Sequence, residues 1–352
     1  MRTSTGVVVD VLRSWWRPLA VAGLSVLAVP ACAPPAAPVA LQGTAMGTTY
    51  SVTVATRPPG IDQWALQAVI DGVIAEAESV LSTWNPGSAI SRFNAERRTD
   101  WIAVPEELVA VVAEAQQVSR ETGGAFDVTV APLVRLWGFD ERRGATAWPA
   151  DEAIHAAQAS TGFQRLELRA RPPALRKADA ALELDVAGIA PGYAVDRIAA
   201  GFDALGAGDY LIELGGEIRA RGRRAPDRPW RVAVERPVPG ERQPYTIVEL
   251  DGAAVSTSGD YRDYREIGGR RVSHTIDPRS GRPVDHDLAS VTVIDGTAAR
   301  ADALATALMV LGPDAGFEFA RENGIAALFL VRRAGASGFD ERVTPAFAQR
   351  RK

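Results

Sequence analysis

Residues 210–220 read Y-L-I-E-L-G-G-E-I-R-A, a strand-like stretch that the paired glycines Gly215 and Gly216 interrupt. Other stretches of apolar and β-branched residues follow it along the chain, at 230–235, 246–250 and 291–294. Helical patterns lie between these runs of strands, but the two types do not alternate one for one as in a βαβ repeat. This order favours an α+β fold with largely antiparallel sheets and packed helices.

The N-terminal half of the folded region is richer in helical patterns. Apolar residues recur at helical spacing over 62–81, which predicts an amphipathic helix that ends before Pro86 and Gly87. Shorter helices are expected at 88–94 and 105–120. Trp84 then lies on a loop at a helix end, where its ring either covers a flat ligand or fills the core.

The first 32 residues differ from the rest of the chain. Arg13 and Arg17 precede an uncharged apolar run at 19–31, which is short for a membrane span but suits a secretory signal. The run ends at Cys32, the single cysteine of the 352 residues, in an L-A-V-P-A-C order that resembles a bacterial lipobox. We therefore predict a signal peptide at 1–31, a lipidated tether at 32–40, and an exported lipoprotein facing the periplasm or the cell exterior. A plain secretory signal with a chance cysteine is the alternative.

Charge and composition narrow the class of protein. The formal net charge is −4, and the basic residues are scattered, so no nucleic-acid footprint is expected. A single cysteine leaves no disulfide within the chain, and folding must rest on burial of apolar residues. The last residues, 339–352, are charged, and we expect them to form a loose tail.

One stretch concentrates chemistry that could serve catalysis. Residues 271–283 read R-V-S-H-T-I-D-P-R-S-G-R-P, with strand character at 272–276 and turn chemistry at 277–281. His274 is one of only three histidines, and histidine is the side chain that exchanges protons near neutral pH. It is either a proton carrier at a strand end or a structural residue that bonds to a neighbouring carbonyl.

Two further stretches place polar groups at helix ends and faces. Residues 182–196 run from a strand through a glycine-containing turn into a helix, which aims backbone N–H groups at a ligand such as phosphate. Neither a Walker loop nor a dinucleotide fingerprint is present. Asp302 and Thr306 lie four residues apart on an otherwise apolar helix at 301–312 and so share one face. They either cap and solvate that helix or supply two oxygen ligands to Mg²⁺.

Taken together, the sequence resembles the ApbE family of flavin transferases, which move FMN from FAD to a threonine or serine of a target protein in the presence of Mg²⁺ and release AMP. The resemblance extends from about Gly43 to Gly312. It rests on seven blocks in the family's order: A-M-G-T-T-Y-S-V at 45–52, L-S-T-W-N-P-G-S at 81–88, G-G-A-F-D-V-T-V at 123–130, D-V-A-G-I-A-P-G-Y-A-V-D at 185–196, S-T-S-G-D-Y at 256–261, H-T-I-D-P-R-S-G-R-P at 274–283 and A-D-A-L-A-T-A-L at 301–308.

The resemblance assigns roles to particular residues. It implies a transferase domain at 41–338 with two lobes that share a flavin-binding cleft. It implies that His274 takes the proton of the acceptor hydroxyl, and that the metal ligands are Gly188 through its carbonyl, Asp302 and Thr306. The implied FAD contacts are Met46, Trp84, Ala125, Phe126, Asp127, Asp185, Pro191 and Ile276. Proline at 191 departs from the lysine or glutamate of many members and removes any side-chain contact there.

The resemblance also implies the partners. FAD is the substrate, and the acceptor is a respiratory or electron-transfer flavoprotein subunit with a target Thr or Ser. The membrane is reached through the lipid anchor. Two other activities fit the same residues: an FAD pyrophosphatase that yields FMN and AMP, and an accessory lipoprotein that binds flavin without catalysis.

Overall fold

The computed structural model of the chain describes residues 37–140, 147–240, 243–261, 264–333, 335 and 338–352. Pro35–Lys352 form one compact unit, and the structure does not divide the described residues of this unit into the two expected lobes. The expected signal peptide and Cys32 lie outside the described residues. Within the described ranges, no helix is both long enough and apolar enough to cross a membrane.

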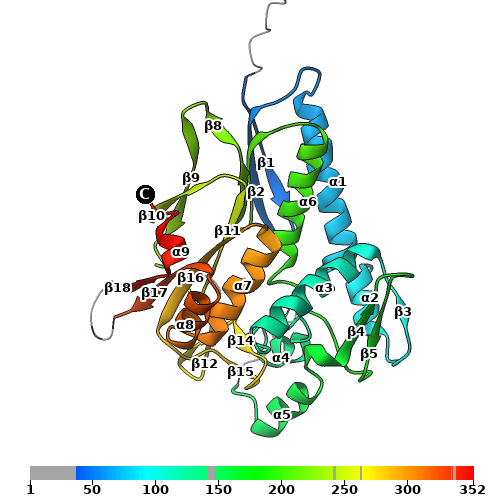
Figure 1. Cartoon of the computed structure of the whole chain (residues 1–352). Coiled ribbons are helices and arrows are strands. Elements are labelled where there is room, and N and C mark those ends of the chain that lie inside the picture. Colours follow the sequence, from blue (N-terminus) through cyan, green and yellow to red (C-terminus); the bar gives the residue numbers. More distant parts are fainter. Residues whose placement is uncertain (1–36, 141–146, 241–242, 262–263, 334, 336–337) are drawn as a thin grey trace, which may run out of the picture. The chain divides into compact units, whose positions relative to one another are not determined.

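An eight-stranded sheet forms the centre of this unit (Figure 1). Its strands, in spatial order, are β1 (Val39–Ala45), β2 (Thr48–Thr56), β6 (Asp209–Leu214), β7 (Glu217–Arg221), β11 (Ala253–Gly259), β16 (Leu288–Asp295), β17 (Ala326–Arg332) and β18 (Phe339–Val343). Every neighbouring pair is antiparallel, which confirms the predicted fold class. Gly215 and Gly216 turn the chain between β6 and β7, both with positive φ.

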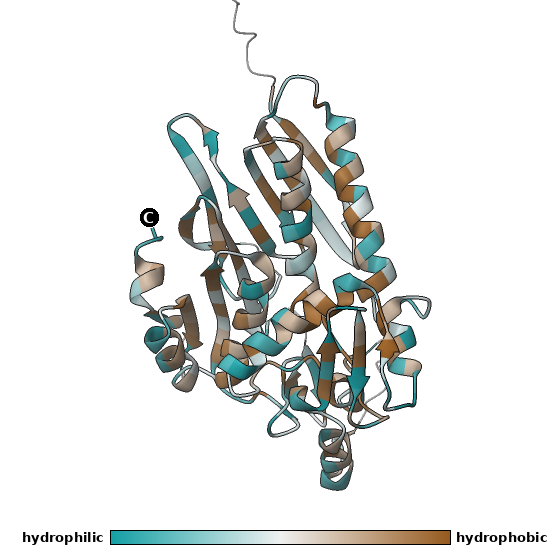
Figure 2. Cartoon of the chain, turned by 45° about the vertical axis from the view of Figure 1, so that its right-hand side comes forward, coloured by the Kyte–Doolittle hydropathy of each residue, from teal (hydrophilic) through white to brown (hydrophobic). Residues whose placement is uncertain are grey.

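Helices provide the second layer. They are α1 (Gln63–Leu81), α2 (Ala89–Ala95), α3 (Glu106–Glu121), α4 (Ala131–Leu136), α5 (Asp151–Ala159), α6 (Ala190–Ala204), α7 (Ala298–Leu311), α8 (Ala315–Glu322) and α9 (Pro345–Ala348). The helix α7 packs on β11 and β16, α6 packs on α7, and α1 packs on α6. Figure 2 shows apolar patches recurring along α1, as expected for a helix with one buried face.

The close packing of α6 and α7 depends on one glycine. A Cβ atom at Gly192 would lie 2.4 Å from the carbonyl oxygen of Ala298, so no larger residue fits there. At the N-terminus of α7, Asp196 accepts hydrogen bonds from the N–H groups of Ala298 and Ala299 at 3.0 and 2.9 Å. These contacts fix α7 relative to α6 and to the sheet.

A small sheet covers the opposite face of the large one. Its strands are β10 (Pro244–Leu250), β9 (Arg228–Glu235) and β8 (Arg223–Ala225), in that order. Apolar side chains of β9 and β10 pack with those of β7, β11, β16 and β17 in one buried cluster. The remaining strands are short: β3 (Ile102–Ala103), β4 (Leu166–Arg169), β5 (Ala174–Lys177), β12 (Tyr264–Ile267), β13 (Arg270–Ser273), β14 (Ile276–Asp277) and β15 (Arg282–Pro283).

The predicted loose tail at 339–352 is wrong. Residues Phe339–Val343 form β18, which pairs with β17 at the edge of the large sheet. Phe347 of α9 is fully buried in the cluster beneath the small sheet. The charged residues that suggested a loose tail make ion pairs instead, as Arg351 does with Glu341. At the other end β1 begins at Val39, inside the stretch predicted as a tether.

The prediction of a strand at the start of 182–196 is also wrong, because residues 182–187 form no strand. The backbone of Leu184 is hydrogen-bonded by a side chain and not by a neighbouring strand. Asn94 accepts from the Leu184 N–H at 2.7 Å and donates to the Leu184 carbonyl at 2.8 Å. A side-chain amide can satisfy one backbone donor and one acceptor in this way, which a pattern of apolar residues does not reveal.

Lys177 is a buried cation whose titration yields a stability prediction. Its Nζ donates to the Glu96 carbonyl at 2.8 Å and lies 4.6 Å from the centre of the Phe93 ring. Burial lowers the pKa of Lys177 to about 8 from the ordinary 10.5. Below pH 8 the amine is charged in the folded and in the unfolded chain, so the full cost of burying the charge opposes folding. Between pH 8 and 10.5 the unfolded chain binds more protons than the folded one, so stability rises with pH.

We therefore expect the wild type to gain about 1–3 kcal/mol in unfolding free energy relative to Lys177→Met between pH 7.5 and 10. Urea unfolding of both proteins at the two pH values measures this difference. Because other groups titrate in both proteins, only the change in the difference between them is informative. Equal pH dependence of the two proteins would contradict the buried charge at Lys177.

Candidate functional site

A cavity of about 1460 Å³ lies where the large sheet, α7 and several loops meet. Pockets for single small molecules usually measure roughly 300–1,000 Å³, so this one has room for a large ligand and part of a second molecule. Most of the residues predicted as site residues line it: Trp84, Ala125, Phe126, Asp127, Asp185, Gly188, His274, Ile276, Asp302 and Thr306. The fold thus brings together side chains from segments that are far apart in the sequence.

Asp302 lies one turn into α7 and is only 5% exposed. Its Oδ2 accepts a hydrogen bond from the Gly192 N–H at 3.4 Å, at the start of α6. The glycine that lets α6 and α7 approach each other therefore also contacts this carboxylate. Asp302 is held at the wall of the cavity by the packing of two helices.

The electrostatics of Asp302 favour a bound cation. Burial, and next the nearby Glu217 carboxylate of β7, raise the pKa of Asp302 well above its ordinary value. Both effects penalise the ionised form of this carboxylate. A cation between these groups would offset the penalty, and carboxylate and hydroxyl oxygens are ligands that Mg²⁺ accepts.

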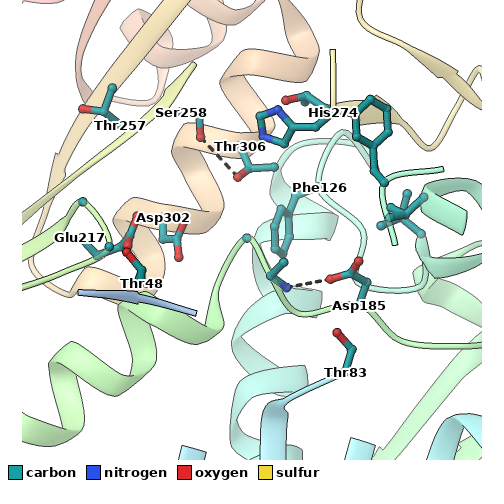
Figure 3. A pocket seen from close by; sticks show the side chains of 18 of the residues that line it. Thr48, Thr83, Phe126, Asp185, Glu217, Thr257, Ser258, His274, Asp302 and Thr306 are labelled. Atoms are coloured by element: carbon teal, nitrogen blue, oxygen red, sulfur yellow. Dashed lines mark hydrogen bonds between the residues drawn. The ribbon is translucent and has the colours of Figure 1, made fainter. Parts of the chain in front are cut away.

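Thr306 follows Asp302 by one helical turn and faces the same cavity (Figure 3). Its Oγ1 lies 3.4 Å from the Oγ of Ser258 on β11. Across from it, a Cβ at Gly188 would lie only 3.0 Å from this Oγ1 and 3.2 Å from the Phe126 ring. The backbone at Gly188 is therefore close to the threonine hydroxyl, as a shared ligand set requires. The residues present fit a small divalent cation.

His274 lies between β13 and β14, where the predicted continuous strand at 272–276 is interrupted. The imidazole is half-buried, lines the cavity and meets the Phe139 ring edge-on, with ring centres 6.4 Å apart. Figure 3 shows it above Phe126, on the same cavity as Thr306. A histidine on this wall can accept a proton from a hydroxyl that enters the cavity.

The turn after His274 is structural, as its sequence suggested. Gly281 has φ 70°, and a Cβ there would lie 2.8 Å from Ile154. Its carbonyl accepts from the indole N–H of the buried Trp137 at 2.9 Å. Ile276 packs in the same small cluster as Trp137 and also lines the cavity. The turn therefore anchors the strand end that carries His274.

The turn after α3 presents Ala125 and Phe126 to the cavity. Gly123 and Gly124, both with positive φ, end the helix as predicted. Asp127 is buried, and its oxygens accept from the Thr129 N–H at 2.8 Å and the Phe163 N–H at 2.7 Å. Burial raises its pKa, and these hydrogen bonds partly oppose the shift. Asp127 borders the cavity, but its carboxylate chiefly holds this turn in shape.

Two other predicted contacts, Trp84 and Asp185, also line the cavity. Trp84 is 63% exposed, so its ring covers the cavity and does not fill the core. Asp185 accepts from the Ala187 N–H at 2.8 Å, and its own N–H donates to the Val128 carbonyl at 2.7 Å. Burial raises the pKa of Asp185.

Met46 and Pro191 are not among the residues that line the cavity. Met46 occupies a turn position with φ 51°, donates its N–H to Glu78 at 3.2 Å, and packs between two core clusters. Pro191 lies in the first turn of α6, where its missing N–H costs nothing. The absent side-chain contact at 191 is thus compatible with a well-formed helix start.

Several polar residues of the cavity were not predicted from the sequence. Glu217 follows the glycine pair that turns β6 into β7, and Thr257 and Ser258 belong to a hydroxyl-rich stretch. The buried Glu183 holds Arg97 and Arg135 on the cavity wall, with N–O distances of 2.9 and 2.7 Å. The hydroxyl-rich stretch was a usable signal, but the position of Glu217 depends on strand pairing.

Comparison with known proteins gives consistent matches. The family model described as the ApbE family matches residues 46–329. A Vibrio cholerae protein named FAD:protein FMN transferase is 39% identical, covering 96% of this chain and 98% of its own. A Salmonella typhimurium protein of the same name is 40% identical, covering 90% and 89% respectively.

Solved structures agree with these sequence matches. The apo form of a Pseudomonas stutzeri flavinyl transferase ApbE has a TM-score of 0.81 and 44% identity, covering 89% of this chain and 96% of its own. A flavin transferase ApbE from Vibrio cholerae has a TM-score of 0.81 and 38% identity, covering 90% and 99% respectively.

Proposed function

The chain belongs to the ApbE family, and on that premise we propose that it is an FAD:protein FMN transferase. It transfers FMN from FAD to a Thr or Ser hydroxyl of a target flavoprotein. The observation that carries this proposal is the convergence of Asp302, Thr306, Gly188 and His274 on one large cavity. Metal ligands and a proton acceptor on the same cavity are what FMN transfer requires, whereas binding of flavin alone requires neither.

The acceptor oxygen forms a bond to the phosphorus of the FMN half of FAD, and the bond from that phosphorus to the bridging oxygen of the AMP half breaks. His274 receives the hydroxyl proton, which makes an otherwise weak alcohol nucleophile reactive. The products are a phosphoester-linked flavin on the acceptor and free AMP.

Mg²⁺ would be held by the carboxylate of Asp302, the hydroxyl of Thr306 and the carbonyl of Gly188. When bound, the ion offsets negative charge on the diphosphate and on the departing AMP. The chain's own part is to orient these ligands: α6 and α7 fix Asp302, and Ser258 lies beside the Thr306 hydroxyl. Glu217 adds negative charge that increases the attraction for a cation.

FAD binding is assigned to the wall formed by Trp84, Ala125, Phe126, Asp185 and Ile276. The exposed ring of Trp84 is suited to stacking on a flat ring of FAD. Phe126 and Ile276 are buried at 4% and 6% exposure and offer apolar contacts from two different segments.

Trp84 supplies a direct test of this wall. Aromatic contacts of this type contribute roughly 0.5–1.5 kcal/mol, so Trp84→Ala should weaken FAD binding by about 3- to 10-fold. Because the side chain is mostly exposed, the melting temperature should not fall. Titration with flavin fluorescence measures the Kd, and Trp84→Phe, which keeps a ring, should bind nearly as the wild type does. Unchanged affinity in Trp84→Ala would remove this residue from the FAD site.

The activity is tested by incubating the protein with FAD, Mg²⁺ and a threonine-containing domain of a respiratory flavoprotein subunit. Transfer adds the mass of one FMN unit to that domain and releases AMP. Free FMN and AMP with an unmodified domain would indicate an FAD pyrophosphatase. Intact FAD would indicate a flavin-binding accessory protein, and either result would contradict the proposal.

The location and partner proposals rest on the sequence. Residues 1–31 act as a signal peptide, and lipid on Cys32 attaches the protein to a membrane facing the periplasm or the cell exterior. An exported position would bring the enzyme to respiratory or electron-transfer flavoproteins exposed on that side. Cell fractionation checks this: Cys32→Ala should leave the membrane fraction, and its retention there would contradict lipid attachment.

A further inference from the structure

The strand β9 borders the cavity in an unusual way. Its residues Arg231–Glu235 all line the cavity, one after another. Side chains of a strand alternate between its two faces, and Val232 and Val234 are indeed buried against the large sheet while Ala233 is exposed. Consecutive residues can border one cavity when the edge of the strand faces it.

The backbone hydrogen bonds that β10 makes on the side away from β9 show which backbone groups of β9 point to the cavity. The Glu249 N–H donates to the Arg350 carbonyl, and the Ile247 carbonyl accepts from the Lys352 N–H. Alternate residues of a strand direct their backbone groups to opposite sides, so Val248 and its alternate neighbours face β9. Val248 is paired with Val232.

β10 therefore forms its backbone hydrogen bonds with Trp230, Val232 and Val234 of β9. Arg231 and Ala233, which pair with Glu249 and Ile247, direct their N–H and carbonyl groups away from β10. The outward groups of Arg231 and Ala233 therefore point to the cavity.

In the described part of the chain, no strand pairs with this edge of β9 beyond its first residues. The short strand β8 reaches only Arg228 and Pro229. Natural sheets usually protect such edges, because unpaired backbone groups are a template for another extended chain. Here the unprotected stretch coincides with the cavity wall.

We propose that the target segment of the acceptor protein binds as an added strand along Arg231–Val234 of β9. This inference rests on the proposed function, which requires a polypeptide hydroxyl to enter the cavity. Four residues of strand span about 13 Å, enough to hold the acceptor residues that flank the hydroxyl. Strand addition binds the main chain of a peptide, so it can position a target hydroxyl with little demand on the flanking sequence.

Charge favours a peptide over the nucleotide at this edge. Glu213 of β6 and Glu235 of β9 line the cavity, against Arg231 as the basic residue of that strand stretch. These carboxylates repel the diphosphate of FAD, whereas a peptide backbone carries no net charge. The acceptor groove is the part of the cavity that is lined by Arg231–Val234 of β9 and by Thr49 and Ser51 on the polar side of β2. Asp302 and Thr306 line the same cavity.

The test removes one outward N–H. Ala233→Pro deletes the donor, and proline is tolerated at edge positions whose N–H does not serve the sheet. A lost backbone bond that leaves an acceptor carbonyl unsatisfied should raise the KM for the acceptor domain by about tenfold or more. The Kd for FAD and the melting temperature should stay at wild-type values. Ala233→Val keeps the N–H and should restore the KM to within about threefold of wild type. A wild-type acceptor KM in Ala233→Pro would overturn the proposal.

A second measurement uses the unaltered enzyme and does not depend on folding of the proline variant. An acceptor domain with its target threonine changed to valine binds but cannot react. Hydrogen exchange followed by mass spectrometry should show slower exchange in the peptide covering 230–236 when this domain is present. Unchanged exchange there, with the domain bound, would overturn the inference. A wild type that transfers no FMN would instead contradict the proposed function, and the exchange result would still decide where the acceptor binds.

Discussion

Replacing Asp302 with asparagine is expected to lower the rate of FMN transfer by about a thousandfold, which corresponds to the several kcal/mol that a metal ion supplies to a developing charge. The protein should remain folded, because the amide oxygen can still accept the Gly192 N–H and because the buried negative charge is removed. Steady-state transfer with saturating FAD, Mg²⁺ and acceptor measures the effect.

Metal binding provides an independent readout for the same variant. A ligand that binds only the folded state raises its melting temperature, so Mg²⁺ should stabilise the wild type but not Asp302→Asn. Thr306→Val is the matched variant on the next helical turn and should show a smaller loss of both properties, because it removes a neutral ligand. Near-wild-type transfer in Asp302→Asn at saturating Mg²⁺ would exclude Asp302 as a metal ligand.

Replacing His274 with alanine is expected to lower transfer by about a hundredfold to ten-thousandfold, the usual contribution of a general base. The Kd for FAD should change little, because the proposed role of the imidazole is to accept the proton of the acceptor hydroxyl and not to hold FAD. Transfer rates and FAD titrations of the same preparation separate the two effects.

His274→Gln is the control for this prediction. Glutamine retains hydrogen-bonding groups but cannot take up a proton near neutral pH, so it should be as slow as alanine. Recovery of the rate in His274→Gln would indicate that position 274 orients the acceptor and does not accept its proton. An unaltered rate in His274→Ala would remove the histidine from the mechanism.

Local sequence patterns predicted those parts of the site that depend on one element. Asp302 and Thr306 share a helix face because they are four residues apart, and α7 places both on the cavity. Gly123 and Gly124 end α3 and bring Phe126 to the cavity wall, as glycines with positive φ permit. The antiparallel arrangement was predicted from the succession of strands in runs, without a regular βαβ repeat.

What the sequence did not predict depends on contacts between distant segments. Glu217 reaches Asp302 because β7 and α7 are placed together by the sheet, and no local spacing records that contact. The strand expected near Leu184 gave way to bonds from Asn94, ninety positions earlier in the chain. Met46 was assigned from a resemblance of sequence blocks, but the hairpin turns its side chain toward the core.

The packing of the C-terminal residues 339–352 also depends on distant segments and could not be predicted from the sequence. The charges of these residues suggested exposure, but Phe347 finds a buried place only once β17 and the small sheet exist. Backbone bonds from Arg350 and Lys352 then orient β10, and through it the open edge of β9. A segment that was expected to be loose thus bears on the proposed acceptor groove.

A single turnover with the enzyme and the acceptor domain in excess over FAD tests most directly whether FMN is transferred to the acceptor protein. The measured quantity is the ratio of AMP released to FMN bound covalently to the acceptor domain. If the cavity carries out direct transfer to a protein hydroxyl, each AMP should be matched by one protein-bound FMN. AMP accompanied by free FMN and an unmodified acceptor would contradict the account.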